Sequence, residues 1–312
     1  MPDAFDPDVE TYLALVAKSQ RPAFEALSVA DARAFYRSGR GTVNLPPVAV
    51  GPIEDLDADG RMGPIRLRHY RTPATRQAPG PCILFFHGGG WVIGDLDTHD
   101  SICQHLVLET GLPLIAVDYR LAPEHPFPAA VEDSLDVHGW IIGNADSLDI
   151  DPARIIVAGD SAGGCLALVT ALSAEDSDRP RPMAQLLFYP VTDIGGTTAS
   201  YQEVRDVPLT ASTMDWFVGH YLPDGADGRD WRMSPARSER LSTAPPTFIT
   251  VAGHDPLRDE GLALAAMLEA EGVTVQLRYL PGQVHGYLTL GRLIGEAGQT
   301  LSCAARFIKN ML

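Results

Sequence analysis

The sequence predicts a doubly wound α/β domain on an eight-stranded, mostly parallel sheet, and three observations support this prediction. The chain has 312 residues, of which 45% are hydrophobic and 21% charged, so it can bury a large core and is too apolar to be disordered. Six short apolar runs lack polar alternation, which is typical of strands buried on both faces of a parallel sheet. Helical stretches separate these runs, as parallel connections require.

Two helices are expected before the sheet. Apolar residues recur with helical spacing in residues 8–19 and 28–38. Ser28 followed three residues later by Asp31 is typical of a helix N-terminus, because the serine side chain can cap a free backbone N–H. The stretch Leu45-Pro46-Pro47 then separates this helical segment from the rest of the chain. We therefore expect residues 1–45 to form a unit of their own.

The eight strands are expected as two antiparallel strands followed by six parallel ones. The first two are predicted at 48–54 and 64–70, joined by a turn at 57–60. The six buried runs that follow are Cys82–Phe86, Leu112–Val117, Ile155–Ala158, Gln185–Tyr189, Phe248–Ala252 and Val275–Leu280.

One segment breaks the alternation of strand and helix. Residues 195–240 hold no buried run, but Met214–Tyr221 has helical spacing. We expect an insertion here that packs with the N-terminal helices as a cap. The predicted division is 1–45 for the N-terminal cap helices, 46–194 for the first part of the core, 195–240 for the cap insertion and 241–312 for the second part of the core.

Charge and composition exclude several classes of function. The 40 acidic and 24 basic side chains leave a net charge of −16, which repels nucleic acid and anionic membranes. No apolar stretch reaches the roughly 18 residues that a membrane span needs. The four cysteines lie far apart, without a metal-binding spacing, so we expect reduced thiols, a cytoplasmic location and no metal site.

The stretch Gly159–Gly163 has the pattern G-x-S-x-G, with Ser161 at its centre. A buried run precedes it and a helix of small residues, 164–174, follows it, which is the setting of a nucleophile elbow. The glycines permit a tight turn that exposes the serine hydroxyl above the sheet. The alternative is a loop serine near a phosphate-binding turn, although the chain has neither G-x-G-x-x-G nor a P-loop. Ser161 is therefore the candidate nucleophile.

The stretch His87–Trp91, His-Gly-Gly-Gly-Trp, follows the first buried run directly. Glycines after such a strand let backbone N–H groups approach a ligand, and with the amide after the nucleophile they can form an oxyanion hole. We predict that the amides of Gly88, Gly89 and Ala162 form it. The alternative makes His87 the general base, but its place at a strand end favours a hydrogen bond that orders the loop.

Three histidines follow the candidate nucleophile, namely His220, His254 and His285. His285 lies in a loop after the last strand, from which it can reach back over the sheet edge. Asp255 ends the neighbouring strand, whereas Asp259 and Glu260 are interpreted as the start of the next helix. The predicted triad is therefore Ser161, Asp255 and His285, in the chain order of this fold class.

Five motifs together resemble the bacterial carboxylesterases of the hormone-sensitive-lipase group, family IV, in the α/β-hydrolase superfamily. They are HGGGW (87–91), YRLAPEHPFPAA (119–130), GDSAGG (159–164), DPLRDEG (255–261) and HGY (285–287). The resemblance runs from about residue 80 to the C-terminus. It implies an α/β-hydrolase core with a helical cap, ester hydrolysis without a cofactor, and frequently a homodimer through the last strand. Tyr287 stands where the family usually has phenylalanine, which leaves the substrate preference open.

The expected function is a serine carboxylesterase that hydrolyses short-chain acyl esters through an acyl-enzyme on Ser161. Trp91 and Tyr287 are expected to line the substrate pocket. The only partner expected besides a second copy of the chain is a small-molecule ester. A non-catalytic receptor on the same scaffold is the alternative from another class, although the intact His285 speaks against it. An amidase or thioesterase remains open, because these reactions share the same acyl-transfer groups.

Overall fold

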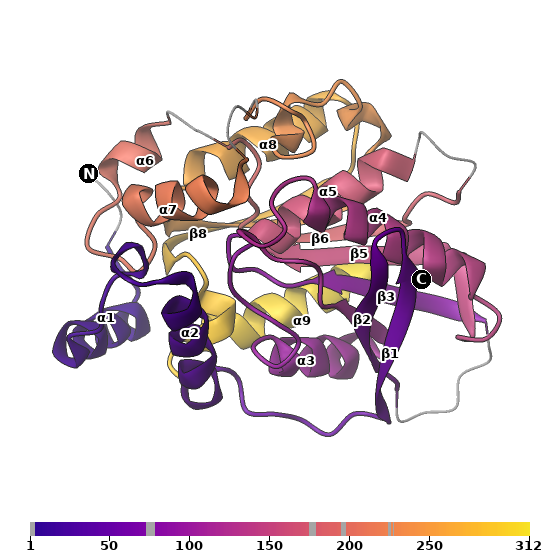
Figure 1. The fold of residues 1–312 in the computed structure, drawn as a ribbon, viewed down its shortest axis with the longest axis horizontal. Helices are drawn as coiled ribbons and strands as arrows, with labels where there is room; N and C mark the ends of the chain where they lie inside the picture. The colour runs from indigo at the N-terminus through magenta and orange to yellow at the C-terminus, as the bar shows by residue number, and fades with distance from the viewer. Residues whose placement is uncertain (1–3, 73–78, 175–178, 195–197, 224–225, 227) are drawn as a thin grey trace.

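In the computed structural model, the chain folds around one eight-stranded sheet with helices on both faces (Figure 1). The strand order is β1-β2-β4-β3-β5-β6-β7-β8; β1–β2 and β2–β4 are antiparallel, and every other neighbouring pair is parallel. The predicted fold class is therefore confirmed. The start of the expected insertion, residues 195–197, lies outside the described residues, which are 4–72, 79–174, 179–194, 198–223, 226 and 228–312.

The strands are β1 (Ile53–Gly60), β2 (Gly63–Tyr70), β3 (Gly80–Phe86), β4 (Leu114–Val117), β5 (Ile150–Asp160), β6 (Ala184–Phe188), β7 (Thr247–His254) and β8 (Val275–Val284). The α-helices are α1 (Pro7–Ser19), α2 (Val29–Val43), α3 (Asp100–Thr110), α4 (Ala129–Gly143), α5 (Ala162–Ser173), α6 (Ala199–Glu203), α7 (Ala211–Tyr221), α8 (Arg258–Ala270) and α9 (Glu296–Lys309). Helices α3 and α9 cover one face of the sheet, and α4, α5 and α8 cover the other (Figure 1).

The central strands contribute to two cores, one on each face of the sheet. In β3, Leu84 and Phe86 belong to the core under α5, whereas Ile83 and Phe85 belong to the core under α3 and α9. Alternate residues of a strand point to opposite faces, so both sets must be apolar. This explains why the sequence of the central strands shows no alternation of polar and apolar residues.

The expected positions of the first strand, 48–54, and of the turn, 57–60, are wrong. Strand β1 includes the acidic stretch, and the turn lies between the strands, at residues 61–62. On this edge strand only one face is covered: Ala58 is buried, while Asp55 is exposed and pairs with Arg68 on β2. Acidic residues are poor strand formers, but here they occupy the solvated face and cross-strand arginines balance their charge.

Ser28 begins helix α2 as predicted, and its Oγ accepts a hydrogen bond of 3.1 Å from the backbone N–H of Asp31. The helix continues to Val43, beyond the predicted end at residue 38. Two glycines in this last part disfavour a helix by themselves. Contacts with the rest of the protein hold this last part of the helix, because Arg40 hydrogen bonds to Thr289.

The N-terminal helices and the insertion helices lie at the same end of the molecule (Figure 1). Glu25, between α1 and α2, accepts hydrogen bonds from Ser212 (2.9 Å) and Thr213 (3.0 Å) at the start of α7. The N-terminal segment also contacts the sheet, because the backbone N–H of Asp6 donates to the carbonyl of Gly282 on β8, at 3.0 Å. The segment therefore bridges the insertion and the end of the last strand.

Candidate active site

Ser161 lies at the turn between β5 and α5. Its backbone has φ 55° and ψ −119°, a conformation that residues with a side chain rarely adopt. Glycine is needed on both sides, because a Cβ at Gly159 would overlap the backbone of Gly163 and a Cβ at Gly163 would overlap the carbonyl oxygen of Phe86. This tight turn holds the Ser161 side chain at the edge of the sheet where the parallel strands end, directly before α5.

The side chains of Ser161, His285 and Asp255 form a hydrogen-bonded chain. His285 Nε2 lies 2.9 Å from Ser161 Oγ, and His285 Nδ1 lies 2.6 Å from Asp255 Oδ2. The other oxygen of Asp255, whose side chain is buried, accepts a bond of 2.8 Å from the N–H of Leu257. A proton held on Nδ1 by Asp255 leaves Nε2 free to accept the serine proton. The structure thus brings together the three residues selected from the sequence.

The other candidate histidines lie elsewhere, and among the described residues only His285 hydrogen bonds to the side chain of Ser161. His220 is on α7, and His254 stacks on Phe5 with ring centroids 3.9 Å apart. His87 stacks on Tyr119, at 4.3 Å, and its Nδ1 lies 2.9 Å from the carbonyl oxygen of Gly88. Burial, with a smaller contribution from the neighbouring His99, lowers the pKa of His87 to about 4. His87 therefore orders the glycine loop in its neutral form.

The assignment of Gly88 to the oxyanion hole needs correction. The N–H of Gly88 donates a hydrogen bond of 2.8 Å to the buried carboxylate of Asp160. Burial raises the pKa of Asp160, but His99, 3.3 Å away, and this N–H outweigh it, so the pKa lies below its usual value and the carboxylate holds the amide. Gly90, two residues after Gly88, lines the cavity beside Gly89 and has a φ of 59°, in the left-handed region.

Three backbone N–H groups near Ser161 have no acceptor among the described residues. They belong to Gly89, to Gly90 and to Ala162, the first residue of α5. Adding a side chain at Gly89 or Gly90 would produce an overlap, with the Ile93 carbonyl oxygen and the Phe217 ring respectively. Sequence reasoning missed Gly90. The signal in the sequence was Asp160, directly before the serine. A buried carboxylate at this position accepts the N–H of Gly88, the first glycine of the loop, and so leaves the later amides for the oxyanion.

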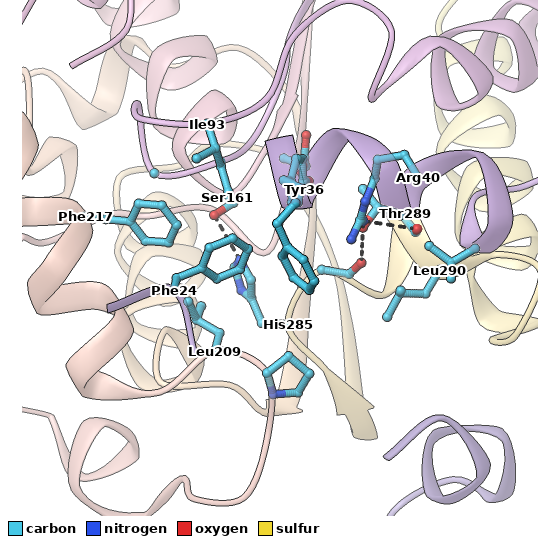
Figure 2. Close-up of a pocket in the computed structure, with 18 of the residues that line it drawn as sticks. Phe24, Tyr36, Arg40, Ile93, Ser161, Leu209, Phe217, His285, Thr289 and Leu290 are labelled. Atoms are coloured by element: carbon cyan, nitrogen blue, oxygen red, sulfur yellow. Dashed lines mark hydrogen bonds between the residues drawn. The ribbon is translucent and has the colours of Figure 1, made fainter. Parts of the chain in front are cut away.

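A cavity lies above Ser161 and His285, between the sheet edge and the two segments that were expected to form a cap (Figure 2). The N-terminal segment contributes Tyr12, Arg21, Phe24, Phe35, Tyr36, Gly39, Arg40 and Val43 to its lining. The insertion contributes Pro208, Leu209, Met214 and Phe217, and the core contributes Gly89, Gly90, Ile93, Asp160, Val191, Gly286, Thr289 and Leu290.

Trp91 and Tyr287 do not line this cavity, so their expected place in the substrate pocket is wrong. Both are fully buried. Trp91 stacks on Tyr221 of α7 with ring centroids 4.2 Å apart, and the hydroxyl of Tyr287 lies 3.0 Å from Thr300 Oγ1 on α9. The strand-to-loop turns at these two motifs direct the large rings into the cores, where each buries the most apolar surface.

Glu260, close to the triad in sequence, holds a loop instead of capping helix α8. Its Oε1 accepts backbone hydrogen bonds from Thr192 (2.7 Å) and Asp193 (3.3 Å). Burial raises the pKa of this carboxyl to about 8, so Glu260 is mostly protonated at neutral pH. Asp259 accepts from the N–H of Ser200 at 2.8 Å. Both residues lie in the first turn of α8, as predicted, and each side chain in addition holds backbone N–H groups of residues that follow β6.

Neither a spanning helix nor a metal cluster is found in the part of the chain that the structure describes. No helix there is long and apolar enough to cross a membrane. No group of three or more histidine, cysteine, aspartate or glutamate side chains is placed to hold a metal ion.

The sheet topology, the serine elbow and the order Ser161, Asp255, His285 define a hydrolase of the α/β type. A family model described as an alpha/beta hydrolase fold matches residues 83–289. The chain is 37% identical over 308 residues to the ethyl acetate hydrolase of Pseudomonas putida, with 96% of each chain covered. It is 37% identical over 317 residues to carboxylesterase NlhH of Mycobacterium tuberculosis, with 100% and 98% covered.

Solved structures of esterases have the same fold as this chain. An ester hydrolase from the metagenome of Lake Arreo, complexed with a bipyridine phosphonate derivative, has a TM-score of 0.93 at 35% identity, with 97% of each chain covered. An esterase of Pyrobaculum calidifontis has a TM-score of 0.89 at 35% identity, covering 98% of this chain and 99% of that one. The chain belongs to the α/β-hydrolase superfamily, among the bacterial esterases of the hormone-sensitive-lipase group, and is a carboxylic ester hydrolase.

Proposed function

We propose that the protein hydrolyses short-chain acyl esters through an acyl-enzyme on Ser161. The hydrogen-bonded chain from Ser161 through His285 to Asp255, at the floor of the cavity, is the observation that carries this proposal. His285 Nε2 takes the serine proton as Oγ attacks the ester carbonyl, and then gives that proton to the leaving alcohol. In the second half of the reaction, His285 activates a water molecule that hydrolyses the acyl-enzyme.

The oxyanion of the tetrahedral intermediate is proposed to bind the N–H groups of Gly89, Gly90 and Ala162. All three lack an acceptor among the described residues, and two of these residues line the cavity beside Ser161. Ala162 also begins α5, so the positive end of that helix faces the developing charge. Gly88 has a different role in this proposal, because its bond to Asp160 fixes the loop that presents the next two amides.

A preference for short acyl chains is supported by the end of the cavity nearest Ser161. Phe24, Leu209 and Phe217 lie there together (Figure 2). The rings of Phe24 and Phe217 have centroids 6.0 Å apart, so the N-terminal segment and α7 close this end with bulky side chains. An acyl chain that extends past these rings at this end has to displace them, which costs packing energy.

A kinetic survey tests the proposed function. Nitrophenyl esters from acetate to decanoate, with a nitroanilide of the best acyl group alongside, give kcat/KM against chain length and against the leaving group. We expect kcat/KM to be highest for acyl groups of six carbons or fewer. We expect it to be low for the nitroanilide. A flat profile up to decanoate contradicts the short-chain preference, and faster anilide than ester hydrolysis contradicts the assignment of the substrate class.

We infer that the N-terminal segment and the insertion together form the cap, and we expect deletion of residues 1–40 to reduce turnover strongly and lower the melting temperature. Turnover falls because the cavity loses Phe24, Tyr36 and their neighbours, which exclude water from the oxyanion. Stability falls because Val9 is fully buried against the core and the Asp6–Gly282 bond is lost. Circular dichroism melting and the chain-length survey measure the two effects. Normal melting with full activity and an unchanged profile contradicts the cap.

A homodimer through β8 is also part of our proposal. This strand is at the edge of the sheet, and Leu277 and Tyr279 on it are 40% and 41% exposed. An exposed edge strand offers unpaired backbone groups to a second copy. Light scattering of the purified protein measures whether the particle has the mass of two chains. All four cysteines are buried and none forms a disulfide among the described residues, which supports our proposal that the enzyme works in the cytoplasm.

A further inference from the structure

The end of the cavity away from the phenylalanines carries a positive charge. Figure 2 shows Arg40 beside Thr289 and Leu290, on the other side of Tyr36 from Phe24, Leu209 and Phe217. Arg40 comes from α2, and Thr289 follows the loop that holds His285. The cavity is therefore apolar at one end and cationic at the other.

Arg40 is held in place but its charge is not balanced. Its Nη1 donates hydrogen bonds to Thr289 Oγ1 (2.5 Å) and to the Thr289 carbonyl (3.3 Å), and its guanidinium stacks over the Tyr36 ring at 4.2 Å from the centroid. No carboxylate pairs with it among the described residues, and its Nε is shielded from solvent without an acceptor.

The other charged residues of the lining do not neutralise Arg40. Arg21 also lines the cavity, and its Nη2 donates only to the hydroxyl of Tyr12, at 3.4 Å. The one carboxylate in the lining belongs to Asp160, which is already engaged by the Gly88 N–H and lies 3.3 Å from His99 Nε2. The cavity is thus lined by two guanidinium groups, and no free carboxylate lies in the lining within the described residues.

We propose that the enzyme prefers esters that carry an ionised carboxylate in addition to the ester group. This carboxylate binds Arg40 while the scissile carbonyl lies at Ser161. This inference rests on the proposed function and names its substrate class. A guanidinium is the side chain best matched to a carboxylate, because its N–H groups form a planar fork. Thr289 and Tyr36 fix the guanidinium before the substrate arrives, so little side-chain entropy is lost on binding. Both placements of the carboxylate, on the acyl part and on the alcohol part of the ester, are compatible with this proposal.

Matched substrates test the proposal. One series pairs the monoethyl esters of succinate, glutarate and adipate with ethyl butanoate, pentanoate and hexanoate, which have a methyl group in place of the carboxylate. A second pair, with the carboxylate on the alcohol part, is 6-acetoxyhexanoate and hexyl acetate. We expect the wild-type enzyme to favour the carboxylate ester in at least one pair. Arg40→Gln should lower the kcat/KM ratio of that pair by about 10- to 100-fold, mainly through KM, as for a lost bond to a charged group.

Three further variants separate recognition from a merely structural role of Arg40. Arg40→Lys should retain part of the preference, and Arg40→Glu should favour ethyl 6-aminohexanoate over ethyl hexanoate, a gain that misfolding cannot produce. Arg292→Gln removes an exposed arginine that does not line the cavity, and it should leave the ratio of the selected pair unchanged. Circular dichroism melting of each variant reports any loss of the α2 contact with Thr289.

The outcomes distinguish this inference from the proposed function. If the uncharged esters are hydrolysed and their turnover depends on Ser161, but every ratio is the same in wild type and Arg40→Gln, the carboxylate preference is wrong and the esterase proposal stands. If turnover of the uncharged esters does not depend on Ser161, the proposed mechanism itself is wrong. A wild-type preference for the uncharged ester in every pair also overturns the inference.

Discussion

Replacing Ser161 with alanine is expected to lower the turnover of a good ester substrate by about 10⁶-fold, the loss seen when a triad nucleophile is removed. The reason is that no acyl-enzyme can form without Oγ, which lies 2.9 Å from His285 Nε2 at the floor of the cavity. Turnover of a nitrophenyl ester by purified protein, with mass spectrometry of the acylated wild type, measures the effect.

Ser173→Ala is the matched control for this prediction. Ser173 ends the same helix that Ser161 precedes, and it does not line the cavity. Its replacement should leave both turnover and acylation close to wild type. Retention of more than a few per cent of wild-type turnover by Ser161→Ala, in a preparation free of contaminating esterase, contradicts the assignment of the nucleophile.

Asp255→Asn is expected to reduce turnover by about 10⁴-fold while the fold remains intact. The Asp255 carboxylate accepts a hydrogen bond of 2.6 Å from the Nδ1–H of His285, whereas an asparagine amide in its place can donate and stabilise the opposite tautomer. His285 Nε2 would then carry the proton and could not accept that of Ser161. Steady-state kinetics of the variant, together with its melting temperature, measure the loss.

Glu260→Gln provides the comparison for Asp255→Asn. Glu260 is buried, and burial raises its pKa to about 8, so the neutral glutamine resembles the form present at pH 7. Its Oε1 bonds to the backbone of residues 192 and 193 can persist in the glutamine. We therefore expect a much smaller loss than for Asp255→Asn. Equal losses at the two positions would mean that the wrong carboxylate has been chosen or that the two act as a unit.

The parts of the fold that the sequence predicted best are those determined by local pattern. A central parallel strand is buried on both faces, so its composition identifies it wherever it lies in the sheet. The elbow at Ser161 is likewise local, because a strand, a glycine turn and a helix are contiguous in the chain. The edge strand β1 was harder to place, because its acidic side chains are compatible with a strand only when arginines of β2 lie opposite them.

The three triad residues could also be selected from the sequence. Parallel strands end at one edge of the sheet, so residues directly after β5, β7 and β8 must lie near one another once the topology is known. The structure places Asp255 and His285 within hydrogen-bond distance, and His285 reaches Ser161. The sheet topology predicted that the three residues lie close together. The order of the motifs along the chain indicated which residue takes which role.

The details of the binding site depended on the tertiary structure. Which glycine amides stay free depended on Asp160, whose carboxylate takes the N–H of Gly88 and leaves that of Gly90 available. Motif position alone also suggested that Trp91 and Tyr287 face the substrate, but both rings turn into the cores.

By itself, the sequence determined the fold class and the choice of Ser161, Asp255 and His285 as the candidate triad, because each depends on contiguous patterns or on the common edge of parallel strands. Only the tertiary structure decided what surrounds the reacting atoms. The cavity is closed by side chains from α2 and α7, which lie far from Ser161 in the chain, and the unpaired charge of Arg40 becomes visible only when its neighbours are known. The pattern of residues within one segment does not indicate which distant segments it contacts. The substrate preference depends on those contacts.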